Sequence, residues 1–177
     1  MIIIFTGNGK GKTTAAIGQS VRALGQGLRV AFLQFIKSDN YPAGEDFFLR
    51  WVGDWYGEKF LFKKGGAGFV GILGDKLPRR VHKEAAEKTL SSALKIISAR
   101  AFDLVVLDEV NVALSLRLIS KKSVLSIIKK TPKDINLILT GRGAAPEIIK
   151  LAHLVTEFRE KKHPFNLGIK ARKGVEY

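Results

Sequence analysis

The stretch of sequence that decides the fold lies near the amino terminus and reads Phe5-Thr6-Gly7-Asn8-Gly9-Lys10-Gly11-Lys12-Thr13-Thr14. An apolar run at residues 2–5 precedes the glycines, and residues 13–24 follow with apolar side chains at helical spacing. Strand, glycine-rich turn and helix in this order are the context of a phosphate-binding loop. Glycines let consecutive backbone N–H groups turn toward an anion, and the start of a helix adds partial positive charge. The stretch therefore predicts a polyphosphate site.

The individual positions of this loop have expected roles. Lys12 should reach the outer phosphates, and Thr13 should offer its hydroxyl to Mg²⁺. Gly11, Lys12 and Thr13 occupy the last three places of the phosphate-loop pattern, whereas Thr6 stands where the first glycine belongs. The residues expected to bind the nucleotide here are Gly7, Asn8, Gly9, Lys10, Gly11, Lys12, Thr13 and Thr14.

A dinucleotide-binding turn is the alternative interpretation, because Gly7 and Gly9 could open one. Such a turn requires a third glycine where this chain has Lys12, and an acidic residue after the second strand, where it has Lys37. The phosphate-binding loop is therefore favoured.

Length and composition set the class of protein. The 177 residues suit one α/β domain, residues 1–177, and the apolar fraction of 46% excludes a disordered chain. The absence of cysteine excludes disulfides and cysteine nucleophiles. The amino-terminal apolar run is too short for a signal peptide or a membrane span, so we expect a cytoplasmic protein without a membrane partner.

The net charge of +14, from 30 basic and 16 acidic residues, allows two interpretations. One is a surface that binds nucleic acid or anionic membrane. The other is a solvated basic surface together with a polyphosphate site. The basic residues form scattered pairs, and aromatic residues do not alternate with them as on a base-stacking surface. The second interpretation is favoured, and nucleic acid is not expected as a partner.

The remaining pattern alternates strands and helices. Strands are expected near residues 2–5, 29–35, 59–62, 102–109, 135–139 and 154–158, and helices over 13–24, 77–100 and 121–130 and after Pro146. Residues 38–46 and 63–74 are predicted loops, the second one mobile, and 47–55 suit either helix or coil. Continuously apolar strands between helices predict a P-loop, RecA-like α/β fold, in which a mostly parallel sheet is covered by helices on both faces.

Right-handed crossovers bring all strand-end loops to one edge of such a sheet, which is where ligands bind. Asp108 and Glu109 end an apolar strand there, as an acid pair that holds Mg²⁺ does. A strand-terminating turn or a helix cap is the alternative role for these two residues. Arg142 could stabilise charge growing on a departing phosphate, and Glu45 could contact ribose or Mg²⁺. The three histidines, His82, His153 and His163, are too dispersed in sequence to predict a metal cluster.

Seven blocks occur in order along the chain: residues 7–16 (GNGKGKTTAA), 34–37 (QFIK), 106–109 (VLDE), 139–142 (LTGR), 154–157 (LVTE), 162–165 (KHPF) and 173–177 (KGVEY). This series resembles the ATP:corrinoid adenosyltransferases of the P-loop, cobalamin-biosynthesis type, and the resemblance covers essentially the whole chain.

The resemblance implies that the Co(I) of a reduced corrinoid attacks C5′ of ATP, so that the whole triphosphate leaves. The phosphate loop would then neutralise charge on a leaving group, with Lys12 and Lys10 holding the triphosphate. Thr13 would hold Mg²⁺ together with Asp108 or Glu109. No general base is required, because the substrate supplies the nucleophile.

The resemblance also implies a corrinoid contact from the mid-chain glycine loop. Phe69 matches a family aromatic that keeps the lower face of cobalt free of a ligand, which makes Co(II) easier to reduce. The family pattern has a tryptophan two residues later, where this chain has Gly71. The family further implies a homodimer and allows for an electron-donating flavoprotein.

Two other classes of function remain open at this point. One is a basic RecA-like ATPase acting on nucleic acid, which should bind polynucleotide with a salt-dependent affinity. The other is a nucleoside or small-molecule kinase, which should release ADP and use a base near its acceptor. The adenosyltransferase should release tripolyphosphate only when reduced corrinoid is present.

Overall fold

A computed structural model describes residues 1–40, 42–72 and 74–175 of the chain. Its centre is a six-stranded sheet in which every pairing is parallel and the strand order is β3-β2-β4-β5-β1-β6. The strands are β1 (Ile2–Thr6), β2 (Val30–Gln34), β3 (Phe60–Lys64), β4 (Leu104–Asp108), β5 (Asn136–Thr140) and β6 (Leu154–Glu157). The predicted α/β class with a parallel sheet is confirmed.

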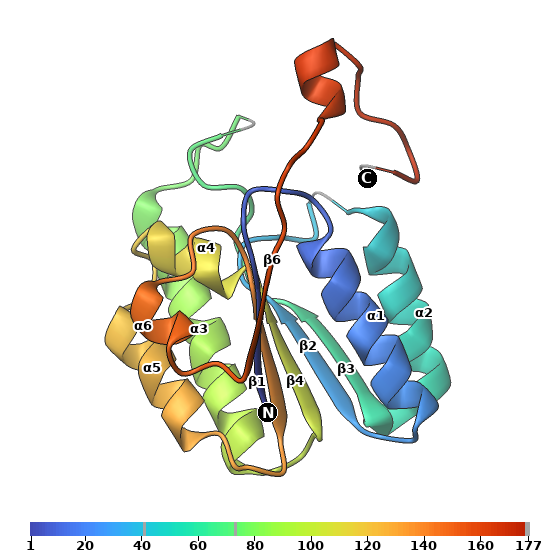
Figure 1. Cartoon of the computed structure of the whole chain (residues 1–177), viewed down its shortest axis with the longest axis vertical. Helices are drawn as coiled ribbons and strands as arrows, with labels where there is room; N and C mark the ends of the chain where they lie inside the picture. Colours follow the sequence, from blue (N-terminus) through green and yellow to red (C-terminus); the bar gives the residue numbers. More distant parts are fainter. Residues whose placement is uncertain (41, 73, 176–177) are drawn as a thin grey trace.

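The helices cover both faces of this sheet, as Figure 1 shows, with α1 and α2 on one side and α3 to α6 on the other. Their bounds are α1 (Lys12–Gly25), α2 (Gly44–Tyr56), α3 (Arg79–Ser98), α4 (Val110–Ser115), α5 (Lys121–Lys130) and α6 (Pro146–Ile149). Two short 3₁₀ turns, η1 (Gly57–Lys59) and η2 (Pro164–Leu167), complete the described elements. Glu176 and Tyr177, which close the carboxyl-terminal sequence block, lie outside the described residues.

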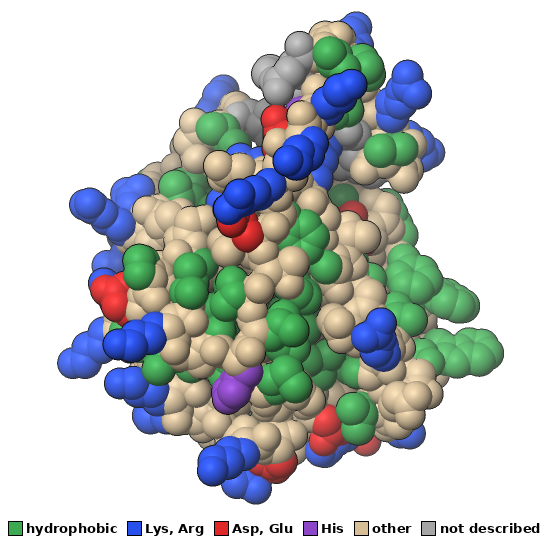
Figure 2. Space-filling view, viewed as in Figure 1, with side chains coloured by type: hydrophobic (Ala, Val, Ile, Leu, Met, Phe, Trp, Pro, Cys, Tyr) green, Lys and Arg blue, Asp and Glu red, His purple; other side chains and the backbone are tan. Residues whose placement is uncertain are grey.

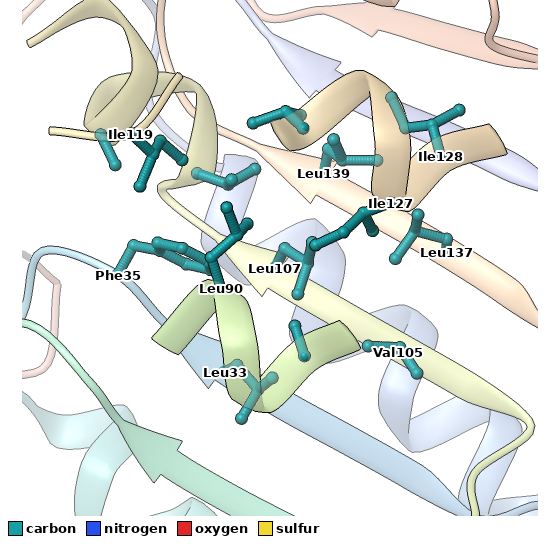
Figure 3. Packing of buried hydrophobic residues seen from close by; sticks show 14 of the residues in the cluster. Leu33, Phe35, Leu90, Val105, Leu107, Ile119, Ile127, Ile128, Leu137 and Leu139 are labelled. Carbon is teal, nitrogen blue, oxygen red and sulfur yellow. The ribbon is translucent and has the colours of Figure 1, made fainter. Parts of the chain in front are cut away.

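Two apolar clusters form the core, one on each face of the sheet. Alternate residues of the central strands serve opposite faces, so that Leu107 and Leu139 pack toward α3 and α5 while Val106 and Ile138 pack toward α1 and α2. In Figure 3, Leu90 of α3 and Ile127 of α5 lie over these strands. Strands buried on both faces explain why the sequence shows continuous apolar runs instead of alternation.

The edge strand β6 differs from this pattern. It pairs only with β1, and all four of its residues are exposed, with Leu154 at 44% and Val155 at 41%. The helices that cover the two faces of the sheet therefore leave this edge strand exposed. Beyond this strand the chain runs away from the sheet as a carboxyl-terminal extension (Figure 1).

Several element boundaries also depart from expectation. The predicted loop at residues 38–46 is wrong at its end, because α2 begins at Gly44. The Asp46 carboxylate accepts a hydrogen bond from the backbone N–H of Ala43 at 2.9 Å, and that contact caps the helix start. Helix α3 begins after Pro78, and the Ser120 side chain caps α5 by accepting a hydrogen bond from the N–H of Ser123. Helix α4 follows Glu109 directly. The sequence indicated a helix here only through the alternative role of Asp108 and Glu109 as a helix cap.

The outer face of α2 is aromatic and exposed. Phe48 and Trp51 have ring centroids 6.0 Å apart, and Trp51 and Trp55 are 6.1 Å apart. Figure 2 shows hydrophobic side chains standing out from the surface on the side where α2 lies. These side chains are therefore not part of the core beneath the helix.

Within the described residues, no helix has both the length and the apolar character needed to cross a lipid bilayer.

Candidate functional site at the carboxyl edge of the sheet

The glycine-rich loop between β1 and α1 closes around the Lys12 ammonium. Lys12 is only 7% exposed, and its Nζ donates to the carbonyl oxygens of Gly7 at 2.9 Å and Gly9 at 2.6 Å. Gly7 and Gly11 have φ angles of 98° and 105°, a region that residues with a Cβ rarely adopt. The local sequence therefore builds a turn with a cation at its centre, which is the arrangement a polyphosphate requires.

Close packing against the backbone is a second reason why glycine is required in this loop, and the sequence did not reveal it. A Cβ on Gly7 would lie 2.4 Å from the carbonyl oxygen of Phe158, and a Cβ on Gly9 would lie 2.9 Å from the same residue. The N–H of Gly9 donates to that carbonyl at 2.8 Å, and the Phe158 ring meets Phe5 edge-on at 5.9 Å. The Gly9 N–H therefore binds the protein backbone instead of pointing to a ligand. The chain after β6 packs against the loop and holds it in place.

Thr6, which replaces the first glycine of the pattern, is buried at the end of β1. Its hydroxyl accepts a hydrogen bond from the N–H of Ala144 at 3.3 Å, and its carbonyl accepts one from the N–H of Phe158. The loop thus tolerates a side chain at this position because the side chain points to neighbouring segments. The other polar residues of the loop, Asn8, Lys10 and Thr14, are exposed.

Asp108 gathers side chains from four elements at this edge. Its Oδ1 accepts hydrogen bonds from the hydroxyls of Thr13 at 2.9 Å and Thr140 at 2.7 Å. Its Oδ2 accepts one from Gln34 Nε2 at 3.1 Å, and the whole residue is buried. The sequence predicted that Thr13 and Asp108 come together, and the structure confirms that contact. The sequence also brought Gln34 and Thr140 to this edge as strand ends, but it did not predict their contacts with Asp108.

Glu109 lies among several charges. Its backbone is left-handed with φ 62°, and its N–H donates to the Thr140 hydroxyl at 2.9 Å. Burial raises the pKa of Glu109 to about 7, and the neighbouring Asp108 carboxylate adds to that shift. Three cations oppose it: Lys37, Lys12 and Arg142. In turn, burial lowers the pKa of Lys12, although the Glu109 carboxylate opposes that change.

Lys37 is a second cation at this edge, where the sequence placed residues 34–37 without giving Lys37 a role. Its Nζ forms an ion pair with Glu45 at 2.7 Å. Burial would lower the pKa of Lys37, but Asp108 and the hydrogen bond to Glu45 outweigh it, so the pKa is raised. Glu45 lies in the first turn of α2, not on a loop as expected. It therefore holds a lysine whose charge acts on the acid pair.

Arg142 follows β5 on an exposed turn. Gly141 before it has φ 123°, and a Cβ there would lie 2.9 Å from the backbone nitrogen of Val112. The charge of Arg142 acts on both Lys12 and Glu109, so the structure places this arginine at the same site.

Phe69 lies apart from these charged groups, in the segment between β3 and α3. It is half-buried and lines a cavity of about 150 Å³ together with Gly68, Asp75 and Leu77 among others. Gly71 is exposed with φ 70°. The segment begins after Lys64, because β3 runs to that residue, so it starts two residues later than the loop expected from residue 63.

The donor set beside the phosphate loop suits a small hard cation. The Thr13 hydroxyl and the Asp108 and Glu109 carboxylates supply only oxygen atoms, the ligands that Mg²⁺ prefers. Burial and the neighbouring Asp108 carboxylate raise the pKa of Glu109, and a cation bound beside it would favour its ionised form. Among the residues described, no cluster of three or more His, Asp or Glu side chains could hold a metal ion.

Comparisons with known proteins agree over the full length. The family model described as ATP:corrinoid adenosyltransferase BtuR/CobO/CobP matches residues 1–177. A corrinoid adenosyltransferase from Pseudomonas aeruginosa is 38% identical over 177 residues, which cover 100% of this chain and 83% of the relative. Corrinoid adenosyltransferases from Escherichia coli K12 and Salmonella typhimurium are each 34% identical over 182 residues, covering 100% of this chain and 85% of theirs.

Solved structures agree on the fold. A KaiC-like protein from Pyrococcus horikoshii superposes with a TM-score of 0.55 at 18% identity, over 91% of this chain and 74% of its own. The flagellar accessory protein FlaH from Methanocaldococcus jannaschii gives a TM-score of 0.53 at 14% identity, over 88% and 69%. At these identities the likeness shows a shared architecture alone.

Proposed function

This chain belongs to the ATP:corrinoid adenosyltransferase family, whose standard activity is the transfer of an adenosyl group from ATP to a corrinoid, and from that premise we propose how its residues divide the work. The electron pair of Co(I) forms a bond to C5′ of ATP. The C5′–O bond breaks, and the triphosphate leaves with its electron pair. Cobalt is thereby formally oxidised to Co(III). We take residues 1–177 to act as one domain in this reaction.

Lys12 and the glycine loop bind the triphosphate and stabilise it as it leaves. The observation that supports this most strongly is the position of the Lys12 ammonium, which contacts both Gly7 and Gly9 carbonyls inside the loop. On binding, the ammonium exchanges these carbonyls for phosphate oxygens. A fixed cation in a partly desolvated site stabilises negative charge without reorganising at the moment of reaction.

Arg142 and Lys37 add positive charge from the two sides of the acid pair. Their charges act on Glu109 from the turns after β5 and β2, respectively. Arg142 is exposed and free to approach a departing phosphate, whereas Lys37 is held by Glu45. We therefore propose that the role of Glu45 is to orient Lys37.

Thr13 and Glu109 are the residues that would hold Mg²⁺. Asp108 accepts three hydrogen bonds from protein groups, so it orients the Thr13 hydroxyl and keeps one acceptor position, on Oδ2, for the ion. When bound, the metal neutralises charge on the phosphates. Glu109 then carries a charge that the metal-free site disfavours.

Phe69 is proposed to face the corrinoid, because its half-buried ring lines a cavity in the segment between β3 and α3. Its ring would keep water and side chains from the lower face of cobalt. Gly71 leaves space where a larger residue could add to that surface, since a Cβ there would have no neighbour within 4 Å.

The protein is proposed to work in the cytoplasm as a homodimer, with a flavoprotein as the source of electrons for the corrinoid. A nucleic-acid ATPase is less well supported. Figure 2 shows Lys and Arg side chains across the upper part of this face and around its edge. The family match over residues 1–177 is what favours the adenosyltransferase.

The product formed from ATP tests the proposal. The protein is incubated with Mg-ATP and chemically reduced cobalamin, and the nucleotide and phosphate products are separated by ion exchange. Tripolyphosphate and a light-sensitive alkylcorrinoid are expected, in equal amounts and only when corrinoid is present. Formation of ADP without corrinoid would overturn the proposal, and Lys12→Ala serves as the inactive control.

A further inference from the structure

The segment that carries Phe69 is held firmly at its beginning. The N–H of Gly65 donates to the Gln34 carbonyl at 2.8 Å, and the N–H of Gly68 donates to the Ile36 carbonyl at 3.0 Å. A Cβ on Gly66 would lie 2.3 Å from the backbone carbon of Ile36, so the two backbones touch. Phe69 therefore follows directly after an anchor to the chain beyond β2.

A single carboxylate holds the segment at its other end. Asp75 Oδ2 accepts a hydrogen bond from the N–H of Gly71 at 2.8 Å, and Oδ1 accepts one from the N–H of Leu77 at 3.0 Å. His82 Nε2 lies 3.0 Å from Oδ2. Since an ionised carboxylate only accepts, the Nε2–H of His82 is the donor. Asp75 thus ties Gly71, two residues after Phe69, to helix α3.

The Asp75–His82 pair is well buried. The side chains are 9% and 2% exposed, and hydrogen bonds to a charged group are among the stronger ones in proteins. The N–H groups of Gly71 and Leu77 hold the pKa of Asp75 below its usual value, and His82 acts in the same direction. The carboxylate is therefore charged wherever the protein is folded near neutral pH.

Helix α3 holds both ends of the segment. Thr89 donates its hydroxyl to the Gly65 carbonyl at 2.9 Å, and His82 reaches Asp75. These two α3 residues are two helical turns apart and so share one face. The cavity of about 150 Å³ lies between the anchors, with Phe69 and Asp75 both in its wall. Its shape therefore depends on the Asp75 contacts.

We propose that Asp75, held by His82, is a positioning residue for the corrinoid: it fixes the backbone after Phe69, so that the ring and the cavity keep the surface on which the corrinoid packs. This inference rests on the proposed contact between Phe69 and the corrinoid. The hydrogen bonds given for Asp75 and His82 join them to Gly71, Leu77 and each other. The inference therefore separates corrinoid binding from ATP binding.

The test compares Asp75→Asn, His82→Ala and His82→Gln with the wild-type chain. The KM for chemically reduced corrinoid and the KM for ATP are measured, and the EPR spectrum of Co(II) corrinoid is recorded with Mg-ATP to detect a lower axial ligand. Asp75→Asn and His82→Ala should raise the corrinoid KM on the order of tenfold and leave the ATP KM unchanged. His82→Gln, whose amide can donate to Asp75, should have a corrinoid KM close to that of wild type.

Asp103→Asn is the matched control. Asp103 also accepts a backbone N–H, that of Arg29 at 2.8 Å, together with the Arg29 guanidinium, but it lies at the opposite edge of the sheet. This control should leave both KM values and the EPR spectrum unchanged. The inference is overturned if Asp75→Asn behaves like the control, or if it changes both KM values equally. If Asp75→Asn does not fold, the same criteria are applied to the His82 variants.

Phe69→Ala separates this inference from the proposed function. If Phe69→Ala leaves the corrinoid KM and the EPR spectrum unchanged, the proposed corrinoid contact fails, and the positioning role fails with it. If Phe69→Ala impairs corrinoid binding while Asp75→Asn and His82→Ala do not, only the positioning role fails.

Discussion

Thr13 and Asp108 are 95 positions apart in the sequence and share a hydrogen bond of 2.9 Å between the Thr13 hydroxyl and Asp108 Oδ1. This contact joins the first turn of α1 to the end of β4. It places the hydroxyl offered to a metal next to the acid pair, and it makes the phosphate loop and the carboxylates one site.

Removing the Thr13 hydroxyl should abolish metal-dependent turnover. Thr13→Val keeps the shape and loses the hydroxyl, so we expect activity to fall on the order of 10²-fold or more. Thr13→Ser keeps the hydroxyl and should retain most of the activity. Turnover is measured across a range of Mg²⁺ concentrations; equal activity of the two variants would show that the hydroxyl has no part in the reaction.

The close approach of Phe158 to the phosphate loop predicts a loss of stability in Gly9→Ala. The added Cβ would lie 2.9 Å from backbone atoms of Phe158, and such overpacking costs about 1–3 kcal/mol. Gly18→Ala is the control: Gly18 lies in α1 with no atom within 4 Å of its Cβ position, and alanine there should stabilise the helix by about 0.5–1 kcal/mol. Urea unfolding should show a lower free energy of unfolding for Gly9→Ala and a higher one for Gly18→Ala than for wild type.

The raised pKa of Glu109 predicts how stability depends on pH in metal-free protein. Between the ordinary value of 4.5 and the folded value of about 7, the unfolded chain ionises this carboxyl while the folded protein keeps it protonated. The free energy of unfolding should therefore fall as pH rises through this window, by up to about 3 kcal/mol from this group.

Glu109→Gln carries no titrating group at this position, so its stability should decline less than that of wild type between pH 4.5 and 7. Denaturant unfolding at several pH values measures the difference. A wild-type curve that rises over this range in step with the variant would contradict the assignment.

Gly71→Trp should fold and remain active. A side chain at this position has open space, but the φ of 70° is unfavourable for a residue with a Cβ and should cost about 1–2 kcal/mol of stability. Melting temperature and turnover with reduced corrinoid are compared with wild type. Loss of activity in a folded Gly71→Trp would show that Gly71 has a role of its own.

Much of the site could be predicted because it depends on short-range patterns. The glycine-rich turn with Lys12 and Thr13 lies between a strand and a helix, and the acid pair ends an apolar run. Parallel strands connected by right-handed crossovers then bring such strand ends to one edge. Gln34, Lys37 and Thr140 were expected at this edge as strand ends, but their contacts were not predictable: only the sheet order and helix packing place Gln34 and Thr140 on Asp108 and Lys37 on Glu45.

The sequence by itself determined the α/β class, the phosphate loop and the residues that meet at the carboxyl edge of the sheet, because apolar periodicity and glycine positions act over a few neighbouring residues. Only the tertiary structure decided that Phe158 supports that loop from behind, that Glu45 begins a helix and holds Lys37, and that Asp75 binds His82. Each of these depends on which distant segments the sheet order and helix packing bring within hydrogen-bond distance, and no local pattern of residues encodes that distance.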